Sequence, residues 1–300
     1  MTRYSAPHGL DEALQALASG ARPVAGGTDL VVGVRQGRST LPEDLVAIHR
    51  LDVIAGIRDG DSGGLHIGAG TTHLAISGDA AVRTGFTALA DASAIVGSHA
   101  TRAAGTLGGN VANASPAADT VAPLICFGAI ATVRSAGGER HLPVDGLTTG
   151  PRHTTLRPDE LIMGFELPAL PTGSGSAYVR LEYRRQMEIA VVGAGVVVTL
   201  GADGRITAAR VAITALAPTV RRVPEAEAAL VGTTGDEAAR RAAGAAASTA
   251  SSPIDDVRAS ADYRRAMAAV VTRRAIAGAL ARARGETVAI PASSSLFGVD

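Results

Sequence analysis

Short apolar segments and one amphipathic helix characterise the N-terminal part of the chain. Apolar side chains recur at helical spacing over residues 9–20, which predicts a short helix. Apolar steps at residues 23–25 and 45–48 predict two strands. Between them a glycine turn precedes the apolar run at residues 30–34, which predicts a second helix. This order of elements predicts a small α/β unit.

In the next stretch, regular patterns give way to a long run of small residues. Residues 65–69 predict a strand, and residues 75–94 contain helical patches of alanine and leucine. Residues 97–125 are rich in Gly, Asn, Ser and Pro with little periodicity, so we expect a long loop there. Such loops in compact domains are usually functional. Strands are expected again at residues 129–134 and 161–167.

A connector rich in Pro, Gly and Ser at residues 169–177 marks the best domain boundary in the chain. Beyond it, valine-rich runs at residues 191–200 and 206–215 predict two strands joined by a glycine-containing turn. Alanine-rich segments at residues 224–250 and 260–284 predict helices. The second part is therefore expected to place its strands before its helices.

Composition narrows the classes of function. The 300 residues include 28 basic and 28 acidic side chains, which cancel and remove a global electrostatic argument for binding nucleic acid or an anionic membrane. Aromatic residues make up only 3%, so a surface of stacked rings is not expected. Cys126 is the single cysteine, which excludes an internal disulfide and an iron–sulfur cluster ligated by this chain alone.

The distribution of apolar residues also indicates where in the cell the protein is located. The N-terminal residues are mixed polar and charged, without the apolar core of a secretory signal. No run approaches the ~18 apolar residues that a membrane span needs. We therefore expect a soluble cytoplasmic protein.

The glycine pair Gly26-Gly27 is the first candidate binding feature. It lies in the segment VAGGTDLV at the predicted turn from strand to helix. Two glycines there let consecutive backbone N–H groups point into one concavity, and a helix N-terminus adds partial positive charge, which suits a pyrophosphate. An ordinary tight turn with an Asp or Thr helix cap explains the same residues. Neither GxGxxG nor GxxxxGK[ST] occurs in the chain, which contains no lysine.

A second glycine pair opens the block TLGGNVANASPAADT, residues 106–120, which has almost no large side chains. Small residues let a ligand lie against the main chain. Asn110 and Ser115 can donate to phosphate oxygens, and Asp119 can accept from ribose hydroxyls. A compact buried turn that satisfies its own backbone is the alternative. Two separate glycine turns favour a ligand with two phosphates, such as a dinucleotide.

Five sequence blocks, in this order, resemble the FAD-binding medium subunit of the molybdenum hydroxylases. They read GGTDL, IGAGTTH, ATRAAGTLGGNVANASPAADTVAPLI, DELIMGFELP and RRQMEIAVVGAGV, and the resemblance covers about residues 1–285. The family includes aerobic carbon monoxide dehydrogenase and the bacterial xanthine, nicotine and isoquinoline dehydrogenases. The resemblance implies an α+β fold with a two-part FAD-binding domain of the vanillyl-alcohol-oxidase (PCMH) type, followed by a small α+β domain of the carbon monoxide dehydrogenase flavoprotein type. We expect FAD-binding subdomains at residues 1–55 and 56–170 and the C-terminal domain at residues 176–290.

The same resemblance implies which residues bind FAD. Backbone amides for the pyrophosphate would come from the first turn, Ala25, Gly26, Gly27, Thr28, Asp29, Leu30 and Val31. A second phosphate clamp would consist of Thr106, Gly108, Gly109 and Asn110, with Ser115 beside it. Asp119 would hold the ribose or adenosine side, and Ile162 falls where the family places an aliphatic residue near the isoalloxazine. Arg180 falls where many members have a lysine that reaches the flavin.

The function implied by the resemblance is electron relay. The chain would bind FAD non-covalently in a heterotrimer, commonly doubled to a dimer of heterotrimers. A large molybdopterin subunit would oxidise the substrate, and a small subunit with two 2Fe-2S clusters would pass electrons to this FAD and on to an external acceptor. FAD accepts electrons singly and releases them singly or as a hydride equivalent. We therefore predict no catalytic residue and no metal ligand in this chain.

Two other classes of protein remain open. A stand-alone FAD-dependent oxidoreductase on the same fold would need its own substrate pocket and a proton-transfer residue over the flavin. A non-catalytic nucleotide-binding or assembly protein would use the two glycine turns without redox chemistry.

Overall fold

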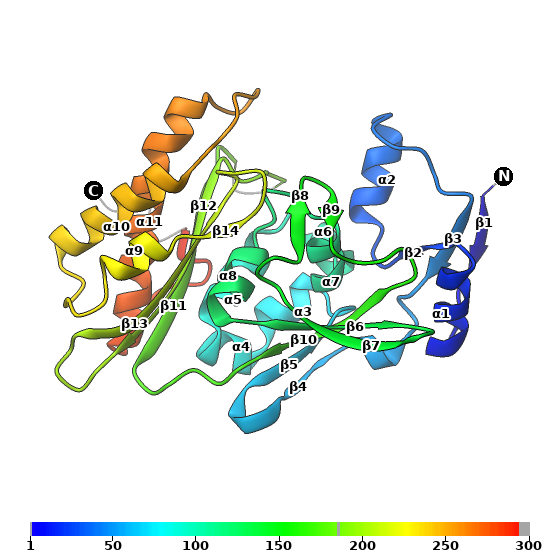
Figure 1. Ribbon diagram of the computed structural model, residues 1–300, viewed down its shortest axis with the longest axis horizontal. Coiled ribbons are helices and arrows are strands. Elements are labelled where there is room, and N and C mark those ends of the chain that lie inside the picture. The colour runs from blue at the N-terminus through cyan, green and yellow to red at the C-terminus, as the bar shows by residue number, and fades with distance from the viewer. Residues whose placement is uncertain (1, 185–186, 294–300) are drawn as a thin grey trace.

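Three large β-sheets divide the molecule into three blocks, which follow one another across Figure 1 from the N-terminal block to the C-terminal block. The computed structural model describes residues 2–184 and 187–293. The first two blocks form the larger N-terminal half, and the third lies at the opposite end of the molecule from the N-terminus (Figure 1).

The first block is a three-stranded parallel sheet with two helices. Its elements are β1 (Arg3–Ser5), α1 (Leu10–Ala18), β2 (Arg22–Val24), α2 (Thr28–Arg35) and β3 (Asp44–Ala47). The sheet order is β1-β3-β2, and Val24 pairs with Ala47 at the carboxyl ends of β2 and β3. The buried face of α1 packs on β3 and its extension, which confirms the α/β unit predicted from the apolar pattern.

The second block is a five-stranded antiparallel sheet, with helices between its second strand and its third along the chain. Its strands are β4 (Ile57–Asp59), β5 (Leu65–Gly68), β6 (Ile130–Ser135), β7 (Gly138–Pro143) and β10 (Leu161–Leu167), in the order β4-β5-β10-β6-β7. A small separate pair is β8 (Thr148–Gly150) with β9 (His153–Thr154), and two 3-10 turns are η1 (Asp52–Ile54) and η2 (Asp61–Gly63). The helices are α3 (His73–Gly78), α4 (Ala80–Gly85), α5 (Thr87–Ile95), α6 (His99–Ala104), α7 (Leu107–Ala112) and α8 (Val121–Phe127).

The prediction of a long loop at residues 97–125 is wrong, because α6, α7 and α8 lie in this segment. Each has six or seven residues, too few to produce a clear helical period in the sequence. Two of them begin at side-chain caps. Ser98 accepts a hydrogen bond from the Thr101 N–H, and Thr106 accepts one from the Gly109 N–H.

The third block is an antiparallel sheet covered by helices on both faces. Its elements are β11 (Ser174–Leu181), β12 (Val192–Leu200), β13 (Ile206–Thr214), β14 (Arg221–Arg222), α9 (Pro224–Ala228), α10 (Glu237–Ala250) and α11 (Ala261–Ala283). The strands predicted on either side of the glycine turn are confirmed as β12 and β13. The first strand, β11, begins inside the segment that the sequence indicated as a connector.

The second and third blocks share one hydrophobic core. Tyr178, Val197 and Ala212 from the C-terminal sheet belong to the same buried cluster as α5 and α8, together with Val220, which precedes β14. The other face of that sheet packs against α10 and α11 in a separate cluster. The C-terminal sheet therefore lies between two helical layers, one from each half of the chain (Figure 1).

Candidate functional site

A cavity of about 300 Å³ lies where the first block meets the second. Its walls come from the β2–α2 turn, the segment after β3, and the segments before α3 and α7. The lining residues are Ala25, Gly26, Ile48, His49, Leu51, Ile54, Ala55, Gly70, Thr72, Ala103, Ala104 and Thr106. This volume is at the lower end of the range for small-molecule sites and suits part of a dinucleotide rather than all of it.

Close backbone packing brings the two predicted glycine turns together here. A Cβ atom on Gly26 would lie 1.8 Å from the backbone oxygen of Ala104, so only glycine fits at this position. Ala104 is the last residue of α6 and precedes the second turn by two residues. The cavity therefore joins the turn at Gly26 to the turn that begins at Thr106, as a shared site requires.

The α2 turn leaves its backbone donors unused. Gly27 has φ +67°, which turns the chain into the helix, and its carbonyl accepts the N–H of Val31. Within the described residues, the N–H groups of Thr28, Asp29 and Leu30 have no acceptor. Free N–H groups at the start of a helix, together with the helix dipole, form an anion site.

The α7 turn, by contrast, has used its first backbone donors inside the protein. The N–H groups of Leu107 and Gly108 donate to carbonyls in the segment after β5, at 3.0 and 2.8 Å. The Gly109 N–H donates to the Thr106 hydroxyl at 3.1 Å. This turn is held in place by the protein at one wall of the cavity. A ligand could still contact its side chains and the exposed backbone at Gly109.

Two polar side chains just beyond the α7 turn keep a donor free. Asn110 accepts from the Thr120 hydroxyl through its amide oxygen at 2.7 Å, and Ser115 accepts from the Ala117 N–H at 3.2 Å. No acceptor is recorded among the described residues for the Asn110 amide N–H groups or for the Ser115 hydroxyl hydrogen. Both residues are half-buried and can still donate to an anionic oxygen.

Asp119 and Arg180 lie together in a buried cluster outside the cavity lining. The Tyr178 hydroxyl donates to one carboxylate oxygen of Asp119, and the Arg180 guanidinium donates to the other, each at 2.7 Å. Arg180 also donates to the Ile95 carbonyl at 3.0 Å and, from Nε, to the Glu182 carboxylate at 2.8 Å. The two residues that the resemblance assigns to opposite ends of FAD are thus direct partners, and they join the second block to the third.

The charges in this cluster depend on one another. Burial raises the pKa of Asp119, and the Arg180 guanidinium opposes that rise. Burial also lowers the pKa of Arg180, but Asp119, Tyr178 and Glu182 outweigh it and raise that pKa overall. Arg180 therefore stays a buried cation that is held by carboxylates from both halves of the chain.

Ile162 is buried in β10, paired with Val133 of β6 beside a bulge that precedes Gly164. Its side chain belongs to the core shared with α5 and α8 and does not line the cavity. The contacts of Ile162, Asp119 and Arg180 with FAD stay predictions.

A buried, neutral histidine, His73, packs against the residue that precedes the α7 turn. His73 is 2% exposed, its backbone N–H donates to the Gly105 carbonyl at 3.0 Å, and its ring lies against Gly105. Within the described residues, Nδ1 of His73 has no hydrogen-bond partner. Burial, with Arg102 adding a like charge nearby, lowers the pKa of His73 to about 4.

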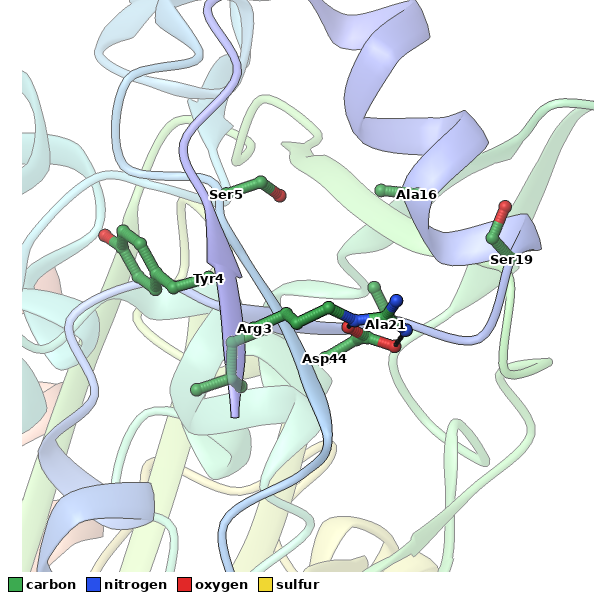
Figure 2. Close-up of a pocket in the computed structure, with 8 residues that line it drawn as sticks. Arg3, Tyr4, Ser5, Ala16, Ser19, Ala21 and Asp44 are labelled. Atoms are coloured by element: carbon green, nitrogen blue, oxygen red, sulfur yellow. Dashed lines mark hydrogen bonds and ion pairs between the residues drawn. The ribbon is translucent and has the colours of Figure 1, made fainter. Parts of the chain in front are cut away.

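A second hollow, of about 250 Å³, lies between β1 and α1. Figure 2 shows Arg3 reaching to Asp44, with Ser19, which directly follows α1, near the same space and Tyr4 pointing away. Arg3 and Asp44 form a paired salt bridge, so the hollow's charged groups already satisfy each other. The cavity at the β2–α2 turn is therefore the better candidate site.

Comparisons with known proteins identify the family of this chain. A family model described as "FAD binding domain in molybdopterin dehydrogenase" matches residues 1–170, and one described as "CO dehydrogenase flavoprotein C-terminal domain" matches residues 177–279. The chain belongs to this family of FAD-binding flavoprotein subunits. The "Carbon monoxide dehydrogenase medium chain" of Afipia carboxidovorans is 34% identical over 94% of this chain and 97% of that protein. The "6-hydroxypseudooxynicotine dehydrogenase complex subunit alpha" of Paenarthrobacter nicotinovorans is 33% identical over 94% of this chain and 95% of that protein.

Solved structures of related proteins have the same fold as this flavoprotein. A chain of the reconstituted CO dehydrogenase from Oligotropha carboxidovorans superposes with a TM-score of 0.89, at 32% identity, over 94% of this chain and 98% of that one. The quinoline 2-oxidoreductase of Pseudomonas putida 86 contains a chain that superposes with a TM-score of 0.87 at 28% identity, with the same coverage. The predicted family, the α+β fold class and FAD as the cofactor are confirmed.

The described part of this flavoprotein contains neither a candidate metal-ligand group nor a candidate membrane span. Among residues 2–184 and 187–293, no three His, Cys, Asp or Glu side chains form a group that could hold a metal ion. No helix in that part of the chain is long and apolar enough to cross a bilayer. Sequence reasoning missed His49 in the cavity lining, although it directly follows a predicted strand, because the order of the strands is not visible in the sequence.

Proposed function

We propose that this flavoprotein relays electrons from the 2Fe-2S subunit of a molybdenum hydroxylase, through bound FAD, to an external acceptor. The observation that carries the proposal is the cavity joining the two glycine turns, lined by Ala25 and Gly26, which the unused N–H groups of Thr28, Asp29 and Leu30 follow in the chain. FAD supplies the chemistry of accepting and releasing electrons when bound. The chain's own residues bind and orient it.

The geometry supports distinct roles for the two turns. The α2 turn donates backbone N–H groups to the pyrophosphate, because its donors are unused. The α7 turn, through Thr106 and Gly109, presents a small, rigid surface against which the cofactor lies. Asn110 and Ser115 add side-chain donors to the phosphates. The Asp119–Arg180 pair fixes the C-terminal sheet beside the site.

The assembly is the second part of the proposal. The relatives named above are a medium chain and a complex subunit, which supports a multi-subunit assembly with large and small partners. We place this chain in a dimer of heterotrimers with a molybdopterin subunit and a 2Fe-2S subunit, located in the cytoplasm.

Purification of the native assembly tests both parts. We expect one FAD per chain by absorbance, co-purification of two further chains with molybdenum and iron, and a mass that corresponds to two heterotrimers. Subcellular fractionation is expected to recover the assembly in the cytoplasm. A colourless chain without affinity for FAD would contradict the cofactor assignment, and a yellow chain that oxidises a small substrate alone would favour the stand-alone oxidoreductase.

A further inference from the structure

His49 and Gly26 both line the cavity, just beyond the carboxyl ends of neighbouring strands of the parallel sheet. Val24 of β2 pairs with Ala47 of β3, and the Ile48 N–H donates to the Val24 carbonyl at 3.0 Å. Gly26 (the glycine packed on Ala104) and His49 each follow this last pair by two residues, and both line the cavity. Ligands of open α/β sheets bind at the carboxyl ends of parallel strands, where neighbouring strands present residues to one crevice.

The imidazole of His49 is the single titratable side chain that lines the cavity. The other lining side chains are aliphatic or carry a hydroxyl, at Thr72 and Thr106. Because the chain has no lysine and no arginine lines this cavity, the lining contains no permanent positive charge to balance a pyrophosphate. An imidazole can supply a donor there, and it does so most strongly when protonated.

The side chain of His49 is free to contact a ligand as far as the described residues are concerned. The residue is exposed, and within the described residues its ring has no hydrogen-bond partner. The guanidinium of the neighbouring Arg50 lies 3.5 Å from Nε2 of His8, within hydrogen-bond distance, and Arg50 does not line the cavity. A histidine that serves the core would be buried and paired, as polar core residues generally are.

We infer that His49 is a positioning residue for the cofactor, donating a hydrogen bond to the pyrophosphate from the side opposite the α2 N–H groups. This inference rests on the proposed function, because it assumes that FAD lies in the cavity. The α2 turn supplies backbone donors from β2, and His49 supplies a side-chain donor from the adjacent strand. The pyrophosphate thereby contacts two neighbouring strands of one sheet.

Ligand binding to the purified, flavin-free full chain tests this role. FAD binding is followed by quenching of flavin fluorescence, and ADP, which carries the pyrophosphate without the flavin, is measured by competition. Loss of one hydrogen bond to a charged group weakens binding by about tenfold, so His49→Ala is expected to weaken both FAD and ADP by about that factor. His141→Ala, which removes an exposed histidine on β7 outside the cavity lining, is the matched control and should bind both ligands as the wild type does.

The outcomes separate this inference from the proposed function. If the wild-type chain binds FAD and His49→Ala binds it with an affinity within twofold of the wild type, the role of His49 is overturned and the proposed function is not. A weaker affinity for FAD with unchanged competition by ADP would place the contact on the flavin instead, and would also overturn it. A wild-type chain without affinity for FAD would overturn the proposed function and this role together. Equal melting temperatures of wild type and His49→Ala exclude misfolding as the cause of a loss.

Discussion

The two glycine turns look alike in sequence but differ in what the fold leaves free. At the α2 turn the first N–H groups have no acceptor within the described residues, and Gly26 packs against the backbone of Ala104. At the α7 turn the N–H groups of Leu107, Gly108 and Gly109 are all engaged, and Gly109 is exposed. The two glycine pairs therefore differ, because Gly26 packs closely against a protein neighbour whereas Gly109 is exposed.

The largest effect is expected from Gly26→Ala. The new Cβ would meet the Ala104 backbone oxygen at 1.8 Å, and backbone cannot move aside as a flexible side chain can. Forcing an atom into such a contact should lower the free energy of unfolding by about 3 kcal/mol. Urea denaturation of the purified chain measures the loss. Gly85→Ala is the control, because no atom lies within 4 Å of its new Cβ, and it should leave stability almost unchanged. Similar midpoints for the two variants would show that the turn does not pack on α6.

A pH dependence is expected from the histidine beneath the α7 turn. Burial lowers the pKa of His73 to about 4 from its ordinary value of 6.5, so the folded state binds fewer protons than the unfolded state between these values. Its contribution to stability is fully present above pH 6.5 and is lost as pH falls from 6.5 towards 4, by up to about 3 kcal/mol.

Comparison with a variant isolates this contribution. His73→Leu should show a shallower fall in unfolding free energy between pH 6.5 and pH 4 than the wild type, measured by urea denaturation at each pH. His153→Leu, a replacement of an exposed histidine on β9, should keep the wild-type slope. A wild-type slope in His73→Leu would mean that protonation of this ring does not oppose folding.

Gly109→Val is expected to separate ligand binding from stability. A Cβ on Gly109 has one close neighbour, the Thr106 hydroxyl at 2.9 Å, so the substitution disturbs mainly the helix cap and costs about 1 kcal/mol of unfolding free energy. Gly109 is exposed on the turn that begins at Thr106, against which we propose that the cofactor lies, so FAD content per chain should fall at least tenfold by absorbance. Normal FAD content would remove the α7 turn from the site.

The smallest effect is expected at the hollow between β1 and α1. Arg3 and Asp44 pair with each other, and the Arg3 side chain is 81% exposed, so removing it breaks a pair that water already screens. Arg3→Ala should leave both the melting temperature and FAD content at wild-type values. A loss of FAD in this variant would show that the hollow, rather than the cavity at the β2–α2 turn, communicates with the cofactor.

Much of the fold could be predicted because the long elements have clear periods. The helix α11 and the strands β12 and β13 lie within one or two residues of the segments expected from their apolar patterns. The segment with α6, α7 and α8 could not be predicted in this way, since helices of six or seven residues complete fewer than two turns. Their caps, Ser98 and Thr106, are visible in the sequence but look the same as turn residues.

Local sequence motifs were enough to predict the two glycine turns of the site, but not the contacts between segments that are far apart in the sequence. Gly26 and Thr106 were both expected in one site, and the cavity contains both. The pairing of Asp119 with Arg180 spans 61 positions along the chain and depends on how β11 packs against the second block. The position of His49 depends on the register of β2 with β3, which no single-sequence pattern specifies.

The core shared by the second and third blocks makes the chain one cooperative unit despite its two family domains. Because Tyr178, Val197 and Ala212 complete the packing of α5 and α8, a chain cut near residue 170 would expose an apolar face on each fragment. Because the two halves share this core, we expect the free energy gained by binding the cofactor in the N-terminal half to stabilise the C-terminal sheet as well. We expect hydrogen exchange of the β12 backbone amides to slow on addition of FAD, although β12 does not line the cavity.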